Sequence, residues 1–228
     1  MLLDVEGTTT PIAFVSETLF PFARKRVRAF LEERREAAAL DVARLREEHA
    51  ADVARDEAPP PWADTAEGVT AYVERLMDRD CKSTGLKALQ GKIWEAGYRD
   101  GLLRGELYPD VPRAFARWRS RGLRIAIFSS GSVLAQRLIF GHSTAGDLTP
   151  SIEAYFDTTT GSKREADSYR RIAAALGLPP DQVLFLSDVV EELDAAREAG
   201  MATTLIVRSG EPPATEHKAV RDFDALPS

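Results

Sequence analysis

Four short apolar runs, separated by segments of helical periodicity, constrain the fold of this chain more than any other feature. The runs comprise residues 1–3, 123–128, 183–186 and 204–207. Apolar residues recur at helical spacing in other segments, at residues 111–121, 132–140, 168–176 and 191–199. Short apolar runs are typical of buried parallel strands, and their alternation with helices predicts an α/β fold with a doubly wound parallel sheet.

The first run is shorter than a buried strand usually is. Only Met1, Leu2 and Leu3 precede Asp4, whereas a strand commonly has about five residues. Either the first strand is a stub or the natural chain begins upstream of Met1, and both interpretations stay open at this point.

The segment between the first two runs has a different hydrophobic periodicity. From Phe14 to about Gly105 the apolar residues follow a three-to-four spacing, as in Val69, Val73 and Leu76. We therefore predict that residues 1–13 and 106–228 form the α/β core, and that residues 14–105 form an all-helical insertion after the first strand.

Polar residues follow the predicted strands at the points where each strand ends. They are Asp4 and Glu6 after the first run, Ser129, Ser130, Gly131 and Ser132 after the second, and Ser187 and Asp188 after the third. A loop lysine, Lys163, precedes the helix that leads to the third run. Because ligands of doubly wound sheets bind beyond the carboxyl ends of the strands, we expect these residues at one shared edge.

Each of these residues also has a simpler structural interpretation. The serines at 129–132 can cap the helix that follows them. Asp188, together with Glu191 and Glu192, can complement the dipole of the next helix. Lys163 can be an ordinary surface charge. The shared sheet edge favours a common site over four separate structural roles.

The chemistry of such a site follows from the two acidic residues near the N-terminus. Asp4 and Glu6, one residue apart, would repel each other unless a cation lies beside them. A carboxylate nucleophile divides the hydrolysis of a phosphate monoester into two steps, through an aspartyl-phosphate. It must stay ionised beside an anionic substrate, and Mg²⁺ with oxygen ligands allows this. Asp188 would complete the metal site.

The remaining residues fit the phosphate itself. Hydroxyl and N–H groups at Ser129–Gly131 would hold the phosphoryl group at a helix N-terminus. Lys163 would balance the negative charge of the nucleophile and of the phosphoryl oxygens. The sequence therefore predicts a magnesium-dependent phosphoryl-transfer site.

The composition limits the partners and the compartment. The formal net charge of the 228-residue chain is −6, which argues against a nucleic-acid or anionic-membrane surface. The single cysteine, Cys81, excludes an internal disulfide. No run approaches the roughly 20 apolar residues of a membrane span, and the N-terminus lacks a signal-peptide pattern, so we predict a cytoplasmic protein.

Several segments together resemble a known family. The blocks DVEGTTTPIAFV, LKALQGKIWEAGY, YPDVP, FSSGSVLAQ, FDTTTGSK and FLSDVVEELDAA are similar to those of the enolase-phosphatases of methionine salvage, which are haloacid dehalogenase-like phosphatases. The similar blocks extend over nearly the whole chain. In that superfamily the second acid of the first motif is commonly Asp, whereas this chain has Glu6.

The resemblance implies a bifunctional enzyme. Its substrate would be 2,3-diketo-5-methylthiopentyl-1-phosphate, which is enolised and then dephosphorylated to the acireductone. Mg²⁺ would be the cofactor, the protein would be a monomer, and residues 14–105 would be the helical cap of a Rossmann-like core.

The resemblance also implies roles for individual residues. Asp4 would be the nucleophile and a metal ligand, and Asp188 a metal ligand. Glu6 would bind the metal and act in acid–base catalysis, by contact with the metal, the leaving group or the enolisable carbon. Ser129, Ser130 and Lys163 would contact the substrate, and Lys163 would also be catalytic.

Alternatives remain for the cap and for the function. Leu89, Gln90, Gly91, Ile93 and Trp94, with Lys87, either line a pocket for the methylthio group or pack inside the cap. The chain could be a phosphatase or dehalogenase of the same fold with another small substrate, although a dehalogenase needs no metal. It could also be a receiver-type signalling module, but such modules are shorter and lack the helical insertion.

Overall fold

The computed structural model describes residues 1–226, which form two compact units. Among these residues, one unit comprises residues 1–15 and 104–226, and the other comprises residues 16–103. Each unit has its own secondary structure and is described separately below.

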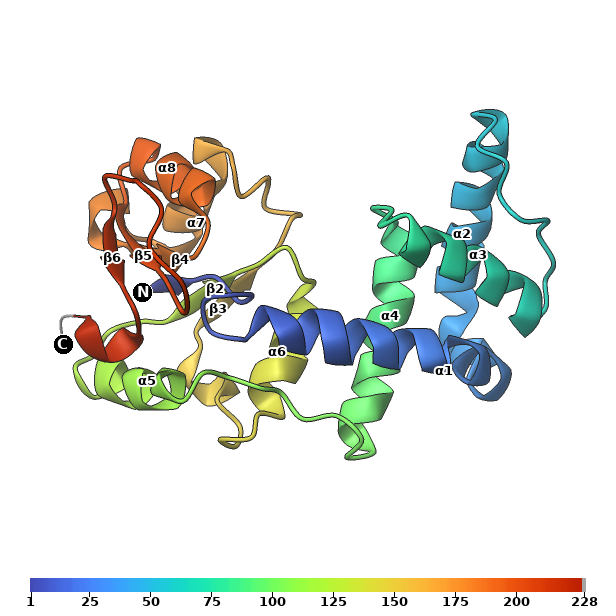
Figure 1. Ribbon diagram of the computed structural model, residues 1–228, viewed down its shortest axis with the longest axis horizontal. Coiled ribbons are helices and arrows are strands. Elements are labelled where there is room, and N and C mark those ends of the chain that lie inside the picture. The colour runs from blue at the N-terminus through green and yellow to red at the C-terminus, as the bar shows by residue number, and fades with distance from the viewer. Residues whose placement is uncertain (227–228) are drawn as a thin grey trace. The chain divides into compact units, whose positions relative to one another are not determined.

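The first unit is built on a parallel sheet of six strands in the order β3-β2-β1-β4-β5-β6 (Figure 1). The strands are β1 (Leu2–Leu3), β2 (Ala126–Phe128), β3 (Ala154–Phe156), β4 (Leu184–Ser187), β5 (Ala202–Ile206) and β6 (Lys218–Val220). All five pairings are parallel. The strand order reverses direction at β1, which is the switch point beside which ligands bind in such sheets.

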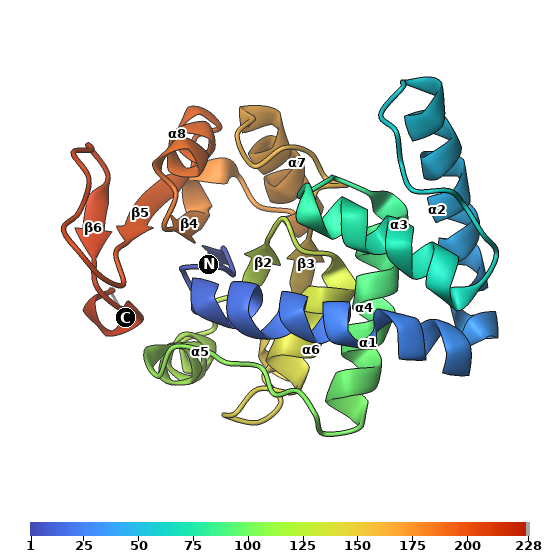
Figure 2. The same ribbon diagram turned by 45° about the vertical axis from the view of Figure 1, so that its right-hand side comes forward.

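Helices cover both faces of this sheet. Helices α5 (Asp110–Ser120) and α6 (Val133–Gly141) lie on one face, and α7 (Ala166–Leu176) and α8 (Val190–Glu198) lie on the other (Figures 1 and 2). Short helical turns complete the unit: η2 (Thr149–Ser151), η3 (Pro180–Gln182) and η4 (Phe223–Ala225). The predicted doubly wound α/β fold is therefore confirmed.

Strand β1 is a stub of two residues, and its central position explains why two residues suffice. Leu2 pairs with Ala126 of β2 and with Phe185 of β4, so the strand is hydrogen-bonded on both sides. The side chains of Leu2 and Leu3 are fully buried. On the face covered by α7 and α8, Leu2 belongs to the same apolar cluster as Phe185 and Tyr169.

Several predicted strand boundaries were wrong. The run at residues 123–128 forms a strand only from Ala126, because Leu123 is exposed and Arg124 pairs with Glu153 at the start of the segment. Strand β5 begins at Ala202, two residues before the predicted start. Strands β3 and β6 were missed, because three residues are too few to show a period.

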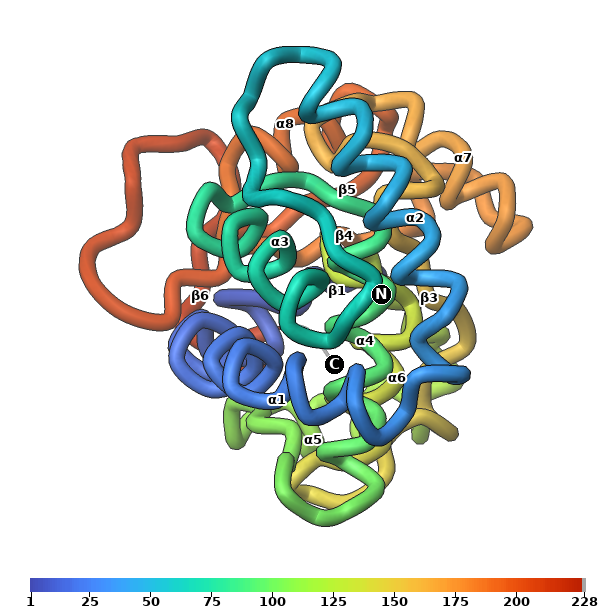
Figure 3. The backbone as a smooth tube through the Cα atoms, turned by 90° about the vertical axis from the view of Figure 1, so that its right-hand side faces the viewer, coloured from blue at the N-terminus to red at the C-terminus, as the bar shows by residue number. Residues whose placement is uncertain are grey.

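The second unit is helical. It contains most of the π-helical turn η1 (Phe14–Leu19) and the helices α1 (Phe20–Glu33), α2 (Arg35–Ala54), α3 (Ala66–Asp78) and α4 (Thr84–Arg99). Helix α2 packs along α4, and α1 contacts both α3 and α4, as the tube view shows (Figure 3). None of the helices within residues 1–226 is long and apolar enough to span a bilayer.

Buried polar contacts hold the proline-rich loop between α2 and α3 in place. The Tyr72 hydroxyl donates to Asp52 over 2.8 Å, and a ring nitrogen of His49 lies 2.8 Å from the carbonyl oxygen of Pro60. The ring of Trp62 packs 5.4 Å from that of His49, measured between centroids. These contacts account for the burial of His49.

Candidate active site

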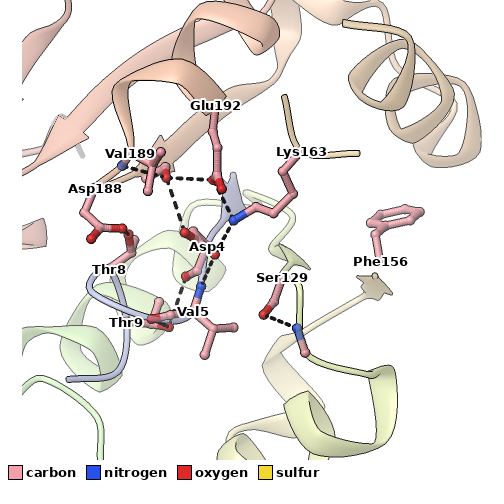
Figure 4. Close-up of polar contacts among 12 residues, drawn as sticks. Asp4, Val5, Thr8, Thr9, Ser129, Phe156, Lys163, Asp188, Val189 and Glu192 are labelled. Carbon is pink, nitrogen blue, oxygen red and sulfur yellow. Dashed lines mark hydrogen bonds and ion pairs between the residues drawn. The ribbon is translucent and has the colours of Figure 1, made fainter. Parts of the chain in front are cut away.

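The residues that follow the strands gather at the carboxyl edge of the sheet, around Asp4 (Figure 4). Asp4 comes directly after β1, and its backbone N–H donates to the carbonyl of Leu186 over 2.9 Å, which extends the pairing with β4 by one residue. Its side chain is buried, and Oδ1 accepts the N–H of Val5 over 2.7 Å. The nucleophile candidate is thus fixed by the sheet itself.

Lys163 is the direct partner of Asp4. Its Nζ lies 2.6 Å from Asp4 Oδ1 and 2.6 Å from Glu192 Oε2, and its side chain is 6% exposed. Burial alone would lower the pKa of Lys163, but the charges of Asp4 and Glu192 reverse this effect and raise its pKa overall. Lys163 is therefore a buried cation and not a surface charge.

Glu192 was not among the predicted site residues. It lies in the first turn of α8, where the sequence suggested only a contact with the helix dipole, yet its carboxylate accepts from both Lys163 and Ser187. Burial, and then the charge of Asp4, raise the pKa of Glu192 to about 7. The sequence signal that could have identified Glu192 is its position four residues after Asp188. This spacing places it about one helical turn from the end of β4.

Ser187 connects the two carboxylates. Its hydroxyl lies 3.0 Å from Glu192 Oε2 and 3.3 Å from Asp4 Oδ2, and its Oγ accepts the N–H of Val189 over 3.1 Å. Since one hydroxyl proton is shared between two acceptors, Ser187 compensates little of the negative charge.

The loop after Asp4 is a tight turn held by its own threonines. The N–H groups of Thr9 and Thr10 donate to the carbonyl of Val5 over 2.9 and 2.8 Å, and the Thr9 hydroxyl lies 3.1 Å from the Asp4 carbonyl. Gly7 has a φ of +69°, which favours glycine. A Cβ at Gly7 would also clash with the Asp188 carboxylate, so glycine lets Asp188 approach the loop.

Asp188 lies beside this loop, at the end of β4. The hydroxyl of Thr8 donates to its Oδ1 over 3.4 Å. Burial, and then the charge of Asp4, raise the pKa of Asp188 to about 6. Lys163 lowers this pKa but does not offset the burial, so a cation beside Asp188 would favour its ionised form.

The carboxylate of Glu6 is in a related environment, although the residue as a whole is exposed. Desolvation by neighbouring atoms raises its pKa, the charges of Asp4 and Asp188 raise it further, and Lys163 opposes the rise. Among Asp4, Glu6, Asp188 and Glu192 there are four acidic groups around one lysine.

The predicted metal ligands can be compared with this geometry. Within residues 1–226, no three His, Cys, Asp or Glu side chains converge closely enough to hold a metal ion. The metal-ligand roles of Asp4, Glu6 and Asp188 therefore stay predictions. Magnesium usually takes one or two carboxylates and completes its shell with other oxygens. The acidic groups of Asp4 and Asp188, with one lysine among them, fit such a cation.

The serine loop after β2 has two distinct parts. Ser132 caps α6, since its side chain accepts the N–H of Ala135 over 3.3 Å, so the capping interpretation holds for this residue. Ser129 is buried and accepts the N–H of Gly131 over 3.0 Å, whereas Ser130 is exposed. Figure 4 shows Ser129 at the strand end next to that of Asp4.

Two further side chains, both missed by the sequence analysis, hold this loop. The amide of Gln136 donates to the carbonyls of Gly131 and Phe156, over 2.9 Å each. Asp157 accepts the N–H of Val133 over 3.2 Å, at the start of α6. The phosphate-loop candidate is thus fixed from the adjacent strand β3.

In the helical unit, the predicted pocket residues lie on α4. The indole of Trp94 donates to the carbonyl of Leu19 over 2.8 Å and packs against Phe20, with 6.0 Å between ring centroids. Leu89 and Ile93 are buried. These contacts account for Trp94 by packing, and the pocket roles of Gln90 and Lys87 stay predictions.

Known proteins resemble this chain over nearly its full length. A family model described as haloacid dehalogenase-like hydrolase matches residues 1–200. A protein of Synechococcus elongatus named enolase-phosphatase E1 is 54% identical over 215 residues, covering 92% of this chain and 89% of that protein. A protein of Drosophila grimshawi with the same name is 46% identical over 234 residues, covering 99% and 95% respectively.

A solved structure agrees with these sequence matches. The crystal structure of the UTR4 protein of Saccharomyces cerevisiae superposes with a TM-score of 0.80 at 35% sequence identity. The match covers 99% of this chain and 98% of the yeast chain, so both compact units have counterparts there.

Proposed function

Because this chain belongs to the haloacid dehalogenase-like hydrolases, and within them to the enolase-phosphatases, we propose that its reactions take place among the residues gathered around Asp4. The chain is a phosphoric monoester hydrolase that converts 2,3-diketo-5-methylthiopentyl-1-phosphate, by way of its enol phosphate, to the acireductone and phosphate in methionine salvage. The assignment of individual residues to the two steps is the proposal.

In the phosphatase step, Asp4 is the nucleophile. A carboxylate oxygen of Asp4 forms a bond to phosphorus, the bond from phosphorus to the oxygen on C1 breaks, and that oxygen leaves with the electron pair and takes up a proton. Water then attacks the aspartyl-phosphate, releases phosphate and regenerates Asp4. The bonds from Lys163 and from the N–H of Val5 to Oδ1 support this role, because they fix the orientation of the carboxylate.

Lys163 and the serine loop hold the phosphoryl group. Lys163 is a buried cation that is already beside the nucleophile, so it can stabilise charge that moves onto the phosphoryl oxygens without reorganisation. The hydroxyl groups of Ser129 and Ser130 lie shortly before Ser132, the N-cap of α6, where a phosphoryl group would meet the helix N-terminus.

In the enolisation step, Glu6 is the proposed base. It takes a proton from C1, the carbon that bears the phosphate ester, while the electron pair moves to the neighbouring carbonyl. The same carboxyl group can then return a proton to the leaving oxygen of the second step. Its position two residues after Asp4, on an exposed part of the loop, supports contact with the substrate.

Mg²⁺ is the proposed cofactor. Asp4 and Asp188 would hold it, with an oxygen atom of Glu6 as a further ligand. When bound, it would supply positive charge that polarises the substrate oxygens. The position of Asp188 supports this assignment: it lies beside the loop that follows Asp4, and its burial and the charge of Asp4 both raise its pKa, an effect that a bound cation would oppose.

The wider setting follows from the family. We propose that residues 16–103 serve as the substrate-selecting cap, and that the enzyme works as a cytoplasmic monomer. Phosphorylated small molecules are the proposed partners, and nucleic acids and membranes are not.

The observation that carries the proposal is the buried contact between Lys163 and Asp4 at the end of β1. The test is to incubate the purified protein with the diketone phosphate and with other phosphate monoesters, and to measure free phosphate and the ultraviolet band of the acireductone. We expect both products from the diketone with Mg²⁺, and neither after exhaustive chelation until Mg²⁺ is restored. Full turnover without metal would refute the cofactor assignment, and turnover of other esters alone would refute the substrate.

A further inference from the structure

Arg208, just after β5, makes an unusual set of contacts with the loop that follows the nucleophile. Its Nε donates to the carbonyl of Thr8 over 3.0 Å, and its Nη2 donates to the same oxygen. Its Nη1 lies 2.8 and 2.9 Å from the two carboxylate oxygens of Asp110. Its side chain is 10% exposed, so the guanidinium is largely withdrawn from water.

The segment Tyr108–Asp110 completes this arrangement. The guanidinium carbon of Arg208 lies 4.1 Å from the centre of the Tyr108 ring, within the range of a cation–π contact. The N–H of Tyr108 donates to the carbonyl of Thr9 over 3.0 Å. Asp110 also accepts the N–H of Phe223 over 2.7 Å, which fixes the carboxylate that holds Arg208.

Two successive carbonyls of the loop are therefore held from outside it, that of Thr8 by Arg208 and that of Thr9 by Tyr108. The side chains of the same two threonines reach the site at different points, that of Thr8 at the Asp188 carboxylate and that of Thr9 at the backbone carbonyl of Asp4. Thr8 Oγ1 donates to Asp188 over 3.4 Å, and Thr9 Oγ1 lies 3.1 Å from the carbonyl of Asp4. The loop thus links the Asp188 side chain to the backbone of Asp4, which the sheet holds in place.

We infer that Arg208, paired with Asp110 and stacked on Tyr108, is a positioning residue that sets the loop so that Asp4 and Asp188 can bind a divalent cation together. The inference rests on the proposed magnesium site and extends it to three residues that are not among the proposed metal ligands or substrate contacts. It also gives a role to the YPDVP segment, which the phosphatase chemistry leaves unused.

The geometry of the guanidinium explains why arginine is needed. Its planar fork can bond a carboxylate on one side and a carbonyl on another at the same time, whereas a lysine ammonium is a point charge on a flexible stem. Asp110 keeps the fork from turning away from Thr8. Groups that orient metal ligands in this way commonly change metal affinity by about 10–100-fold when they are removed.

The test measures Mg²⁺ affinity directly, with Mg²⁺ alone and no substrate. The variants are Arg208→Met, which replaces the guanidinium but keeps an unbranched apolar stem, Arg208→Lys, which keeps the charge, and Asp110→Asn, which keeps the shape of the carboxylate. Arg117→Met is the matched control, because Arg117 donates to Phe223 and pairs with Asp224 in the same region of the fold. Titration calorimetry gives the dissociation constant, and the melting temperature without metal gives the stability.

We expect the dissociation constant for Mg²⁺ to rise about 10–100-fold in Arg208→Met and less in Arg208→Lys, and to stay within about twofold of wild type in Arg117→Met. Arg208→Met should also raise the Mg²⁺ concentration needed for half-maximal turnover. A fall in melting temperature with an unchanged dissociation constant would overturn the inference, because Arg208 would then only stabilise the fold. If Arg208→Met does not fold, the dissociation constant of Asp110→Asn for Mg²⁺ is compared with that of wild type in its place. An unchanged value would overturn the inference.

The metal assignment and the positioning role fail in different ways. Wild-type protein that binds no Mg²⁺ would overturn both. If wild type binds Mg²⁺, and Arg208→Met and Asp110→Asn bind it with the same dissociation constant, only the positioning role is overturned.

Discussion

At the scale of single residues, the charge balance around Lys163 shapes the site. Its ammonium lies 2.6 Å from Asp4 and from Glu192, and all three side chains are buried. A buried ion pair is costly to break, because removal of one partner leaves a charge without compensation. One lysine cannot neutralise two carboxylates and also the nearby Asp188, so the metal-free protein carries excess negative charge here.

Glu192→Gln tests this balance through the pH dependence of stability. The pKa of Glu192 in the folded chain is raised from 4.5 to about 7, so the folded state binds more protons than the unfolded state between those values. Stability must therefore fall as the pH rises through this window. We expect the metal-free wild type to lose stability between pH 5 and pH 8, and Glu192→Gln to lose less.

The measurement is the free energy of unfolding by denaturant at several pH values, with a chelator present. Glu191→Gln, a neighbour in the same helical turn that is exposed, is the control and should follow the wild type. Identical slopes for wild type and Glu192→Gln would show that Glu192 does not carry the excess charge.

At the scale of elements, the loop after β1 brings the strand end and Asp188 together. Gly7 has a positive φ, and a Cβ there would clash with the Asp188 carboxylate. Gly122, in the turn after α5, has a similar φ of +74° but would meet no atom within 4 Å. A substitution at Gly122 therefore introduces backbone strain alone, whereas the same substitution at Gly7 adds the clash with Asp188.

We predict that Gly7→Ala and Gly122→Ala both lose about 1 kcal/mol of stability from the strained φ, and that only Gly7→Ala loses further stability and Mg²⁺ affinity. Thermal unfolding and Mg²⁺ titration of both variants are the measurements. Equal effects of the two substitutions on Mg²⁺ binding would contradict the proposed contact between the loop and Asp188.

The sequence predicted those site residues whose position is marked by a local pattern. Asp4, Lys163 and Asp188 follow apolar runs or precede a helix, and topology then places them at one edge. Glu192 was assigned only to the helix dipole, since an acid in the first turn of a helix suits both roles. Arg208 could not be found, because its partner Asp110 is 98 residues away and only the folded sheet brings the two together.

The same reasoning explains the missed elements of the fold. The long helices and the apolar strands β4 and β5 have a clear period or composition. Strands β3 and β6 have three residues each and are stabilised by pairing with neighbouring strands. This pairing joins residues far apart in the chain, so a local sequence pattern does not predict it.

At the scale of the whole molecule, we expect the two compact units to contribute separately to catalysis and to substrate selectivity. The α/β unit contains Asp4, Lys163 and the serine loop, which we propose act on the phosphoryl group common to all phosphate esters. Gln90 lies on α4 of the helical unit and has no counterpart in that chemistry. We therefore expect the helical unit to contribute selectivity for the carbon skeleton.

Two substitutions test this division. Lys163→Ala should lower the rate on every phosphate ester by about 10²–10³-fold, because it removes charge beside the phosphoryl group. Gln90→Ala should lower kcat/KM for the diketone phosphate more than for a generic ester. Equal losses on both substrates in both variants would show that the division is wrong.

The central claim is that Asp4 acts in phosphoryl transfer and not in enolisation, and Asp4→Asn tests it most directly. The variant, loaded with Mg²⁺, is given the diketone phosphate in deuterated water, and free phosphate, the ultraviolet band of the enol phosphate and deuterium at the C1 methylene are followed together. We predict the band and the exchange without phosphate release. Phosphate release within about tenfold of the wild-type rate, or the loss of both band and exchange although metal and substrate are bound, would contradict the claim.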